Sequence, residues 1–196
     1  IDLNPNAVEL AKVTLMIAKE MSIKEAMDKQ ETLPLDNLDA NIICADALFT
    51  AWPDCDVIIG NPPYQSKNKM QQEFGAAYIN KLREAYLEVP GRADFCVYWF
   101  YKAHKHLKPN HFAGLVGTNT IRQNYSREGS LDYIVNNGGE IINAVSSINW
   151  GGEAAVFVSI ASWVKGKYSG EKILYTTDKN EDLQRHTEQI INSSLS

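Results

Sequence analysis

Apolar residues recur along the chain in two spacings, and together they predict alternating strands and helices. Short runs of consecutive apolar residues at 40–45 and 57–59 are typical of strands buried on both faces of a sheet. The segments 7–21 and 73–89 carry apolar residues every three or four positions, as amphipathic helices do. Further strands are expected at 1–3, 111–117, 140–147, 154–164 and 172–176, and further helices at 95–107, 118–125 and 130–137.

Strands that alternate with helices predict a parallel sheet with helices on both faces. The strands at 140–147 and 154–164 are joined by a short turn at 150–152, which predicts an antiparallel pair at one edge of the sheet. Both features fit a Rossmann-like, doubly wound α/β fold that is mostly parallel and ends in an antiparallel hairpin. We expect this core to span residues 1–177 and a polar tail or linker to follow at 178–196.

Capping residues indicate where several of these elements begin. Asn4 followed by Pro5 is a typical helix start, because the Asn side chain accepts from free N–H groups and proline fits the first helical position. Asp94 is expected in the same way to cap the helix at 95–107. The stretch 65–72 is polar and is expected to be mobile.

The composition is that of an ordinary globular domain with an acidic surface. The 196 residues are 44% hydrophobic and 22% charged, which excludes a disordered chain. The net charge of −5 argues against tight binding of DNA by this chain alone, because phosphate contacts need cations. It leaves open a site that receives one nucleotide while other regions hold the duplex.

Targeting signals and metal ligands are not evident in the sequence. No apolar run could span a bilayer, and the first residues do not resemble a signal peptide. Cys44, Cys55 and Cys96 are widely spaced and are expected to be buried free thiols in a reducing compartment, the cytoplasm. His104 and His106 lie two positions apart on a helix and point to different faces, so they predict no metal site.

The Asn-Pro-Pro-Tyr segment at 61–64 carries the most specific chemistry. It abruptly follows the apolar run at 57–59, and open α/β sheets bind ligands at the carboxyl ends of their strands. Asn61 offers a side-chain carbonyl oxygen and Pro62 a backbone carbonyl, and two successive prolines would preorganise both acceptors. Tyr64 offers a flat ring on which a base drawn out of a duplex can stack.

Two acceptors at these positions suit methylation of the exocyclic amino group of adenine. The lone pair of that nitrogen is delocalised into the ring, and acceptors on its two hydrogens would localise it. In this interpretation Asn61 and Pro62 accept the hydrogens, Pro63 stiffens the turn and Tyr64 stacks on the flipped base. The alternative is that the segment forms only a rigid turn.

The tetrapeptide resembles the signature of the amino-methyltransferases of DNA, in which Asn, Asp or Ser precedes Pro-Pro and an aromatic residue. The resemblance continues through most of the chain and implies S-adenosylmethionine as cofactor and double-stranded DNA as partner. From the positions of these residues, the resemblance implies that Asp2 binds the ribose hydroxyls of the cofactor and that Asp46 binds the cofactor's adenine amino group. It also implies that Asn61 contributes to the cofactor site. For both aspartates the alternative is capping or turn chemistry.

The segment 150–159 resembles one found in large bifunctional restriction-modification enzymes. In those enzymes the turn before the last long strand lies near the target base, which implies that Trp150 stacks on that base opposite Tyr64. The alternative is a tryptophan that packs in the core or against the hairpin.

The chain also departs from the family. The glycine-rich loop that cradles the methionine part of the cofactor would precede Ile1, so we expect a truncated chain that lacks the central first strand and is inactive alone. Strand edges left open in this way are costly. We expect the segment at 40–45 to pair directly with 57–59, or a second copy to fill the slot in a dimer, in preference to a loosely held region before about Asp54.

Two other functions stay open at this point. An Asn-Pro-Pro-Tyr segment suits any planar amide-like nitrogen, so a methyltransferase for protein glutamine or for RNA is the nearest alternative. A non-catalytic recognition subunit that keeps the fold is the second, although an intact tetrapeptide argues against it. The favoured interpretation is the core of an adenine-N6 DNA methyltransferase from a restriction-modification or defence enzyme.

Overall fold

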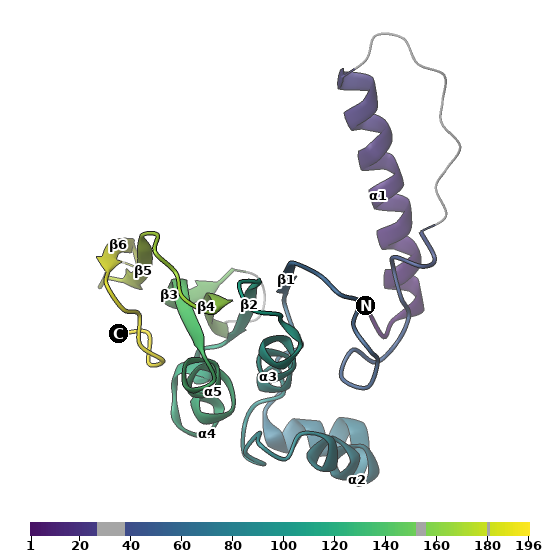
Figure 1. Cartoon of the computed structure of the whole chain (residues 1–196). Coiled ribbons are helices and arrows are strands. Elements are labelled where there is room, and N and C mark those ends of the chain that lie inside the picture. Colours follow the sequence, from purple (N-terminus) through teal and green to yellow (C-terminus); the bar gives the residue numbers. More distant parts are fainter. Residues whose placement is uncertain (27–37, 152–155, 180) are drawn as a thin grey trace. The chain divides into compact units, whose positions relative to one another are not determined.

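The computed structural model describes residues 1–26, 38–151, 156–179 and 181–196, which divide into two compact units (Figure 1). The first unit spans Ile1–Pro53 and the second Asp54–Ser196. Among the described residues, none of the helices is long and apolar enough to cross a membrane.

The first unit contains one long helix, α1 (Pro5–Ala26). It begins where the sequence predicts. The side-chain oxygen of Asn4 accepts the N–H groups of Asn6, at 2.9 Å, and Ala7, at 3.4 Å, and Pro5 is the first helical residue. The helix start is therefore confirmed.

A single parallel bridge joins the two short segments that were expected to be strands in this unit. Asp2 pairs with Cys44: its N–H donates to the carbonyl of Ile43 at 3.0 Å, and its carbonyl accepts from Ala45 at 2.9 Å. The expectation of a buried strand at 40–45 was wrong, because only this bridge forms and Cys44 is exposed.

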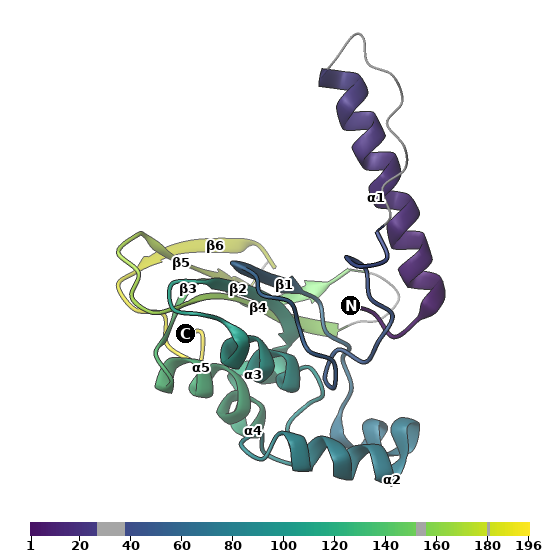
Figure 2. The same ribbon diagram turned by 45° about the vertical axis from the view of Figure 1, so that its right-hand side comes forward.

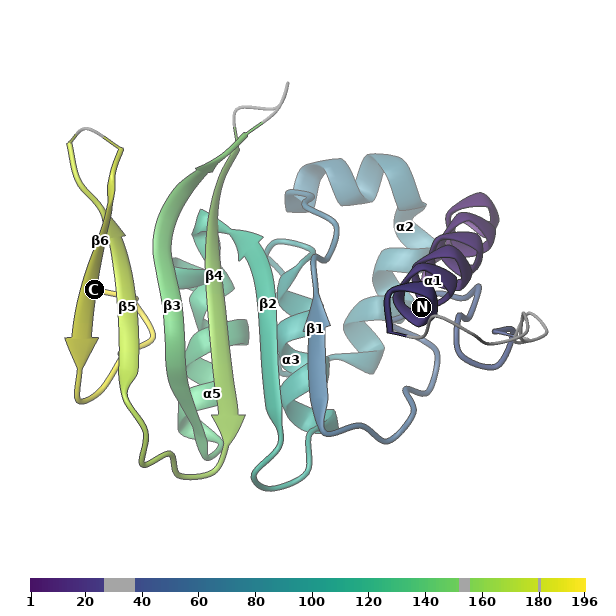
Figure 3. The ribbon, with the colours of Figure 1, turned by 90° about the horizontal axis from the view of Figure 1, so that it is seen from above.

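The second unit is built on a six-stranded mixed sheet in the order β1-β2-β4-β3-β5-β6 (Figure 3). By their pairing, β1, β2, β3 and β5 run in one direction and β4 and β6 in the other. This arrangement confirms the predicted α/β class. The strands are β1 (Val57–Gly60), β2 (Phe112–Thr118), β3 (Gly139–Trp150), β4 (Val156–Lys165), β5 (Lys172–Thr177) and β6 (Leu183–Glu188).

The order of the strands differs from the prediction in one respect. The antiparallel pair β3–β4 does not lie at an edge, because β4 is inserted between β2 and β3 and β5 pairs with the other side of β3. The hairpin at the end of the sheet is β5–β6.

The last residues of the chain also pack against this unit. The segment 178–196, expected to be a polar tail or a linker, contains β6, and Ile191 forms an antiparallel bridge with Ile141. Leu195 is fully buried and Ile191 nearly so. The expectation was wrong for this segment because two isolated apolar side chains, which show no periodicity, insert into the core.

The edge strand β1 is more exposed than its sequence suggests. Val57 and Ile59 have 55% and 83% of their surface exposed, although a buried strand was expected. Among the described residues of this unit, the strand that pairs with β1 is β2.

The helices α3, α4 and α5 lie together on one face of the sheet (Figure 2). Coverage of both faces was predicted, but the helices of this unit that pack on the sheet cover one. The buried ring of Phe100 on α3 stacks on Trp163 of β4, with ring centroids 5.7 Å apart. The elements on this side are α3 (Val97–His106), the 3₁₀ turn η1 (Asn119–Arg122), α4 (Asn124–Arg127), the π-helical turn η2 (Glu128–Asp132) and α5 (Tyr133–Asn136).

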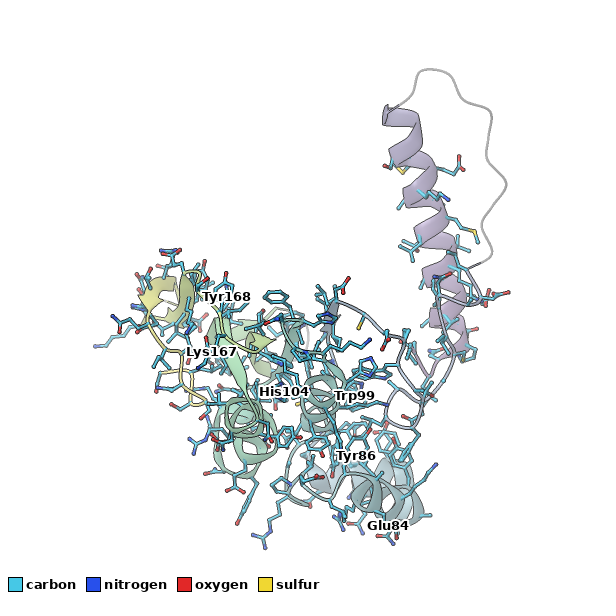
Figure 4. The ribbon with its side chains drawn as sticks, viewed as in Figure 1. Glu84, Tyr86, Trp99, His104, Lys167 and Tyr168 are labelled. Atoms are coloured by element: carbon cyan, nitrogen blue, oxygen red, sulfur yellow. The ribbon has the colours of Figure 1, made fainter. Side chains whose placement is uncertain are left out.

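Aromatic side chains contact one another at α3, in the region where Figure 4 labels Tyr86, Trp99 and His104. Tyr86 makes edge-on contacts with Tyr98 and Tyr101, at centroid distances of 5.5 and 5.8 Å. His104 is buried and its Nε2 lies 3.1 Å from the carbonyl oxygen of Asn137. Burial lowers the pKa of His104, so the ring is neutral at neutral pH and belongs to the core.

The helix α2 (Lys67–Ala85) precedes this cluster and occupies part of the segment expected to be mobile. It is interrupted at Gly75, whose φ of 75° is left-handed and favours glycine. The polar residues from Lys67 onward are therefore helical.

Candidate functional site

The Asn-Pro-Pro-Tyr segment lies at the carboxyl end of β1. Gly60, the last residue of β1, is in register with Leu115 of the parallel strand β2, and β2 continues to Thr118. The segment therefore leaves the sheet beside the last residues of β2. This is the edge at which open α/β sheets hold their ligands.

The side chains of the segment differ in exposure. Pro62 is buried, Asn61 and Pro63 are exposed, and Tyr64 is half-buried. The Tyr64 hydroxyl donates a hydrogen bond to the side-chain oxygen of Asn61. The structure thus brings together two of the predicted site residues through their side chains, and it leaves the Asn61 amide open to solvent.

The phenol of Tyr64 stays protonated at neutral pH. Burial raises its pKa above the ordinary value, the neighbouring Cys96 adds to the increase, and the hydrogen bond to Asn61 opposes it. Tyr64 can therefore act as a neutral donor and a stacking ring, but not as a base.

A turn at residues 94–95 fastens the end of this segment. The backbone N–H of Phe95 donates to the carbonyl oxygen of Gln65 at 2.9 Å. The neighbouring carboxylate of Asp94 accepts from the hydroxyls of Thr118 at 3.0 Å and Thr120 at 2.6 Å, which lie at the end of β2 and just beyond it.

The side chain of Asp94 therefore has a different hydrogen-bonding role from the one predicted. It was expected to cap the helix that follows, but α3 begins at Val97 and its N-cap residue makes no side-chain capping bond. The signal available in the sequence was the pair of threonines spaced two apart after a strand, at 118 and 120. Nothing in the local pattern linked that pair to an aspartate more than 20 residues earlier.

Trp150 lies at the same edge of the sheet as the Asn-Pro-Pro-Tyr segment, because β3 runs parallel to β1. The residue is 41% exposed. The strand register places Ala144 of β3 level with Gly60. Trp150 is six residues farther along β3, and this length of strand is about 20 Å at the usual rise per residue. The strands β2 and β4 also separate β3 from β1. The following residues, 152–155, lie outside the described part of the chain.

The two predicted cofactor residues belong to the first unit. One carboxylate oxygen of Asp2 accepts from the N–H of Asn4 at 2.7 Å, and one of Asp46 accepts from Leu48 at 2.9 Å. Each bond reaches two residues ahead, which is the geometry of an Asx turn. The bridge between Asp2 and Cys44 also places the two aspartates at the ends of neighbouring parallel segments.

The fold is a mixed α/β sheet with the Asn-Pro-Pro-Tyr segment at the carboxyl end of β1. A family model described as the DNA-methyltransferase domain of MmeI matches residues 1–176. Because the match covers most of the chain, the chain belongs to this family. No curated protein sequence matches the chain.

Several solved structures are also similar to this chain. The type IIL restriction-modification enzyme MmeI in complex with DNA is similar over 79% of this chain, with 24% identity and a TM-score of 0.67. The chain spans 22% of the length of that MmeI chain. A modification subunit of a putative type I restriction enzyme from Vibrio vulnificus is 14% identical over 66% of this chain and 28% of its own, with a TM-score of 0.45. A putative class I S-adenosylmethionine-dependent methyltransferase from Listeria monocytogenes is 14% identical over 64% of this chain and 36% of its own, with a TM-score of 0.42.

Proposed function

We propose that this chain is the catalytic core of an S-adenosylmethionine-dependent DNA methyltransferase that modifies the N6 amino group of adenine within a restriction-modification system. One observation carries the proposal: an intact Asn-Pro-Pro-Tyr segment at the carboxyl end of β1 in a chain of the MmeI methyltransferase family. The chain matches 22% of the length of the MmeI chain. We assign recognition of the target sequence to regions outside this part.

The residues of the segment have separate tasks in this mechanism. The side-chain oxygen of Asn61 and the backbone carbonyl of Pro62 accept hydrogen bonds from the two amino hydrogens of adenine. These bonds direct the nitrogen lone pair away from the ring, and Pro63 limits movement of the loop. The Tyr64 ring stacks on the base after it has left the duplex.

The cofactor, when bound, supplies the methyl group. Its sulfonium would give up the methyl group to the adenine nitrogen, which would then lose one proton to solvent. Carboxylates suit the cofactor because each can accept from hydroxyl or amino hydrogens. We assign the ribose hydroxyls to Asp2 and the cofactor's adenine amino group to Asp46.

Trp150 is proposed as a second stacking residue. Its exposed ring at the carboxyl edge of the sheet is available to a base or a neighbouring nucleotide. The net charge of −5 implies that regions outside this chain supply most of the phosphate contacts.

The test is transfer of a labelled methyl group from S-adenosylmethionine to plasmid DNA by the full-length protein, followed by chromatography of the nucleosides. The expected product is N6-methyladenine. Label on cytosine, on RNA or on protein glutamine would overturn the assignment of the acceptor. Label on adenine that persists in the Asn61→Ala variant would overturn the assignment of the site.

A further inference from the structure

The segment at 61–64 needs anchors from elsewhere in the chain. Pro62 and Pro63 have no N–H group, so they cannot donate to neighbouring strands. The segment is tied at its far end by the bond from the N–H of Phe95 to the carbonyl of Gln65, one residue after Tyr64. Whatever holds Phe95 therefore also fixes the end of the catalytic segment.

The carboxylate of Asp94 joins the turn at 94–95 to the end of β2. One oxygen of its carboxylate, Oδ2, accepts both threonine hydroxyls, and the two hydroxyls lie 2.7 Å from each other. Thr118 is the last residue of β2, so the bonds join the turn at 94–95 to the edge at which β1 also ends.

Further contacts hold the turn at 94–95 in place. The backbone N–H of Asp94 donates to the hydroxyl of Ser126 at 3.1 Å, and Phe95 and Cys96 are buried at the start of α3. At the start of α3 the N–H of Val97 donates to the backbone carbonyl of Asp94 at 3.1 Å, whereas the carboxylate accepts from the two threonine hydroxyls. Its two threonine bonds therefore serve a purpose other than starting the helix.

We propose that Asp94 is a positioning residue for the methyltransferase reaction. Through Thr118 and Thr120 it fixes the turn at 94–95 to the end of β2, and through Phe95 and Gln65 it sets the position of Asn61 and Tyr64 above that edge. This inference rests on the proposed function. It adds that the geometry of the acceptors depends on a carboxylate that does not touch the substrate.

The experiment uses the full-length protein and three variants. Asp94→Ala removes both threonine bonds. Asp94→Asn keeps an oxygen in the same place without the charge. Asp132→Ala is the matched control, because its carboxylate is also half-buried and accepts one bond, from Arg127 at 3.1 Å, but has no tie to the segment at 61–64.

Two measurements are made on each protein. The first is kcat and KM for methyl transfer. The second is amide hydrogen exchange of the peptide that contains Tyr64 and Gln65, which needs neither cofactor nor DNA. We expect Asp94→Ala to lower kcat by about 10- to 100-fold, because small displacements of catalytic groups are costly, with KM for the cofactor little changed. We expect faster exchange of that peptide in Asp94→Ala, recovery of both properties in Asp94→Asn, and wild-type behaviour in Asp132→Ala.

Several results would overturn the proposal. Wild-type kcat and exchange in a folded Asp94→Ala protein would do so. An equal loss in Asp94→Asn and Asp94→Ala would also do so, because the charge and not the position would then matter. If Asp94→Ala does not fold, Thr120→Val removes one bond at nearly constant volume and must change kcat and exchange in the same direction. A wild-type protein that methylates no DNA would refute the proposed function, and the exchange measurement would then decide the role of Asp94 alone.

Discussion

The Tyr64 hydroxyl donates a hydrogen bond to the side-chain oxygen of Asn61. That oxygen is the acceptor that we propose for an amino hydrogen of adenine, so the hydroxyl and an incoming base compete for it. The ring and the hydroxyl of Tyr64 therefore have opposite effects. The ring favours the bound base, and the hydroxyl occupies the acceptor while the base is absent.

This relationship predicts different results for two substitutions at Tyr64. Tyr64→Phe keeps the ring and frees the Asn61 oxygen, so the methylation rate should stay near that of the wild type or rise. Tyr64→Ala should lose stacking worth about 1–3 kcal/mol per base. The fluorescence of 2-aminopurine at the target position reports capture of the base. Equal fluorescence with the wild type and with Tyr64→Ala would rule out the stacking role.

Removal of the Asn61 side chain should abolish most activity without unfolding the protein. Asn61 is exposed and its side-chain bond is to Tyr64, so Asn61→Ala costs little stability. Loss of one preorganised acceptor should reduce the single-turnover rate by about 100-fold or more. Asn68→Ala, which removes another exposed amide, is the control and should behave as the wild type. Near wild-type turnover by Asn61→Ala would contradict the catalytic assignment.

The parts of the structure that follow from local chemistry were predictable from the sequence. The start of α1 depends on Asn4 and Pro5, which act within one helical turn. The position of the Asn-Pro-Pro-Tyr segment after a short apolar strand is equally local, because two prolines cannot continue a central strand.

Features that depend on distant partners were not predictable. The insertion of β4 between β2 and β3 follows from which strand edges meet, and a one-dimensional pattern does not record this. Leu195 is buried although its neighbours are polar, because a single apolar side chain can fill a gap in a core without any period. The Asp94 carboxylate was assigned to the nearest helix, whereas its partners lie on the next strand and the turn after it.

The three cysteines should differ sharply in reactivity. Burial raises the pKa of Cys96 to about 11, so its thiol is neutral and inaccessible at pH 8. Cys44 is exposed and Cys55 is intermediate. Ellman's reagent should therefore modify Cys44 rapidly and leave Cys96 intact until the protein is denatured. The sequence had predicted three buried thiols, and only Cys96 is buried.

The raised pKa of Cys96 also predicts a dependence of stability on alkaline pH. The thiol ionises near its ordinary pKa of 9.0 in the unfolded chain but only near 11 in the folded one. Its contribution to stability is thus complete below pH 9 and is lost as the pH rises from 9 toward 11. The loss of unfolding free energy across this range should be smaller in Cys96→Ala than in the wild type. Identical slopes for the two proteins would show that Cys96 is not buried as described.

Gly117 should be the glycine of β2 that least tolerates a side chain. An added Cβ would lie 2.6 Å from Cγ2 of Ile121 and 3.1 Å from the ring of Phe100, and both of those residues are fully buried. Neither neighbour can move toward solvent, so Gly117→Ala should destabilise the protein by about 1–3 kcal/mol, as overpacking of a core does.

The control for this substitution is Gly151→Ala, since an added Cβ there would meet no atom within 4 Å. Urea unfolding followed by tryptophan fluorescence measures both variants. Gly117 also precedes Thr118, so the overpacked variant should weaken the bond to Asp94 and slow methylation, whereas Gly151→Ala should leave stability unchanged. Equal unfolding free energies for the two variants would mean that Ile121 and Phe100 can rearrange around the new methyl group. In that case the end of β2 would be too compliant to position the catalytic segment.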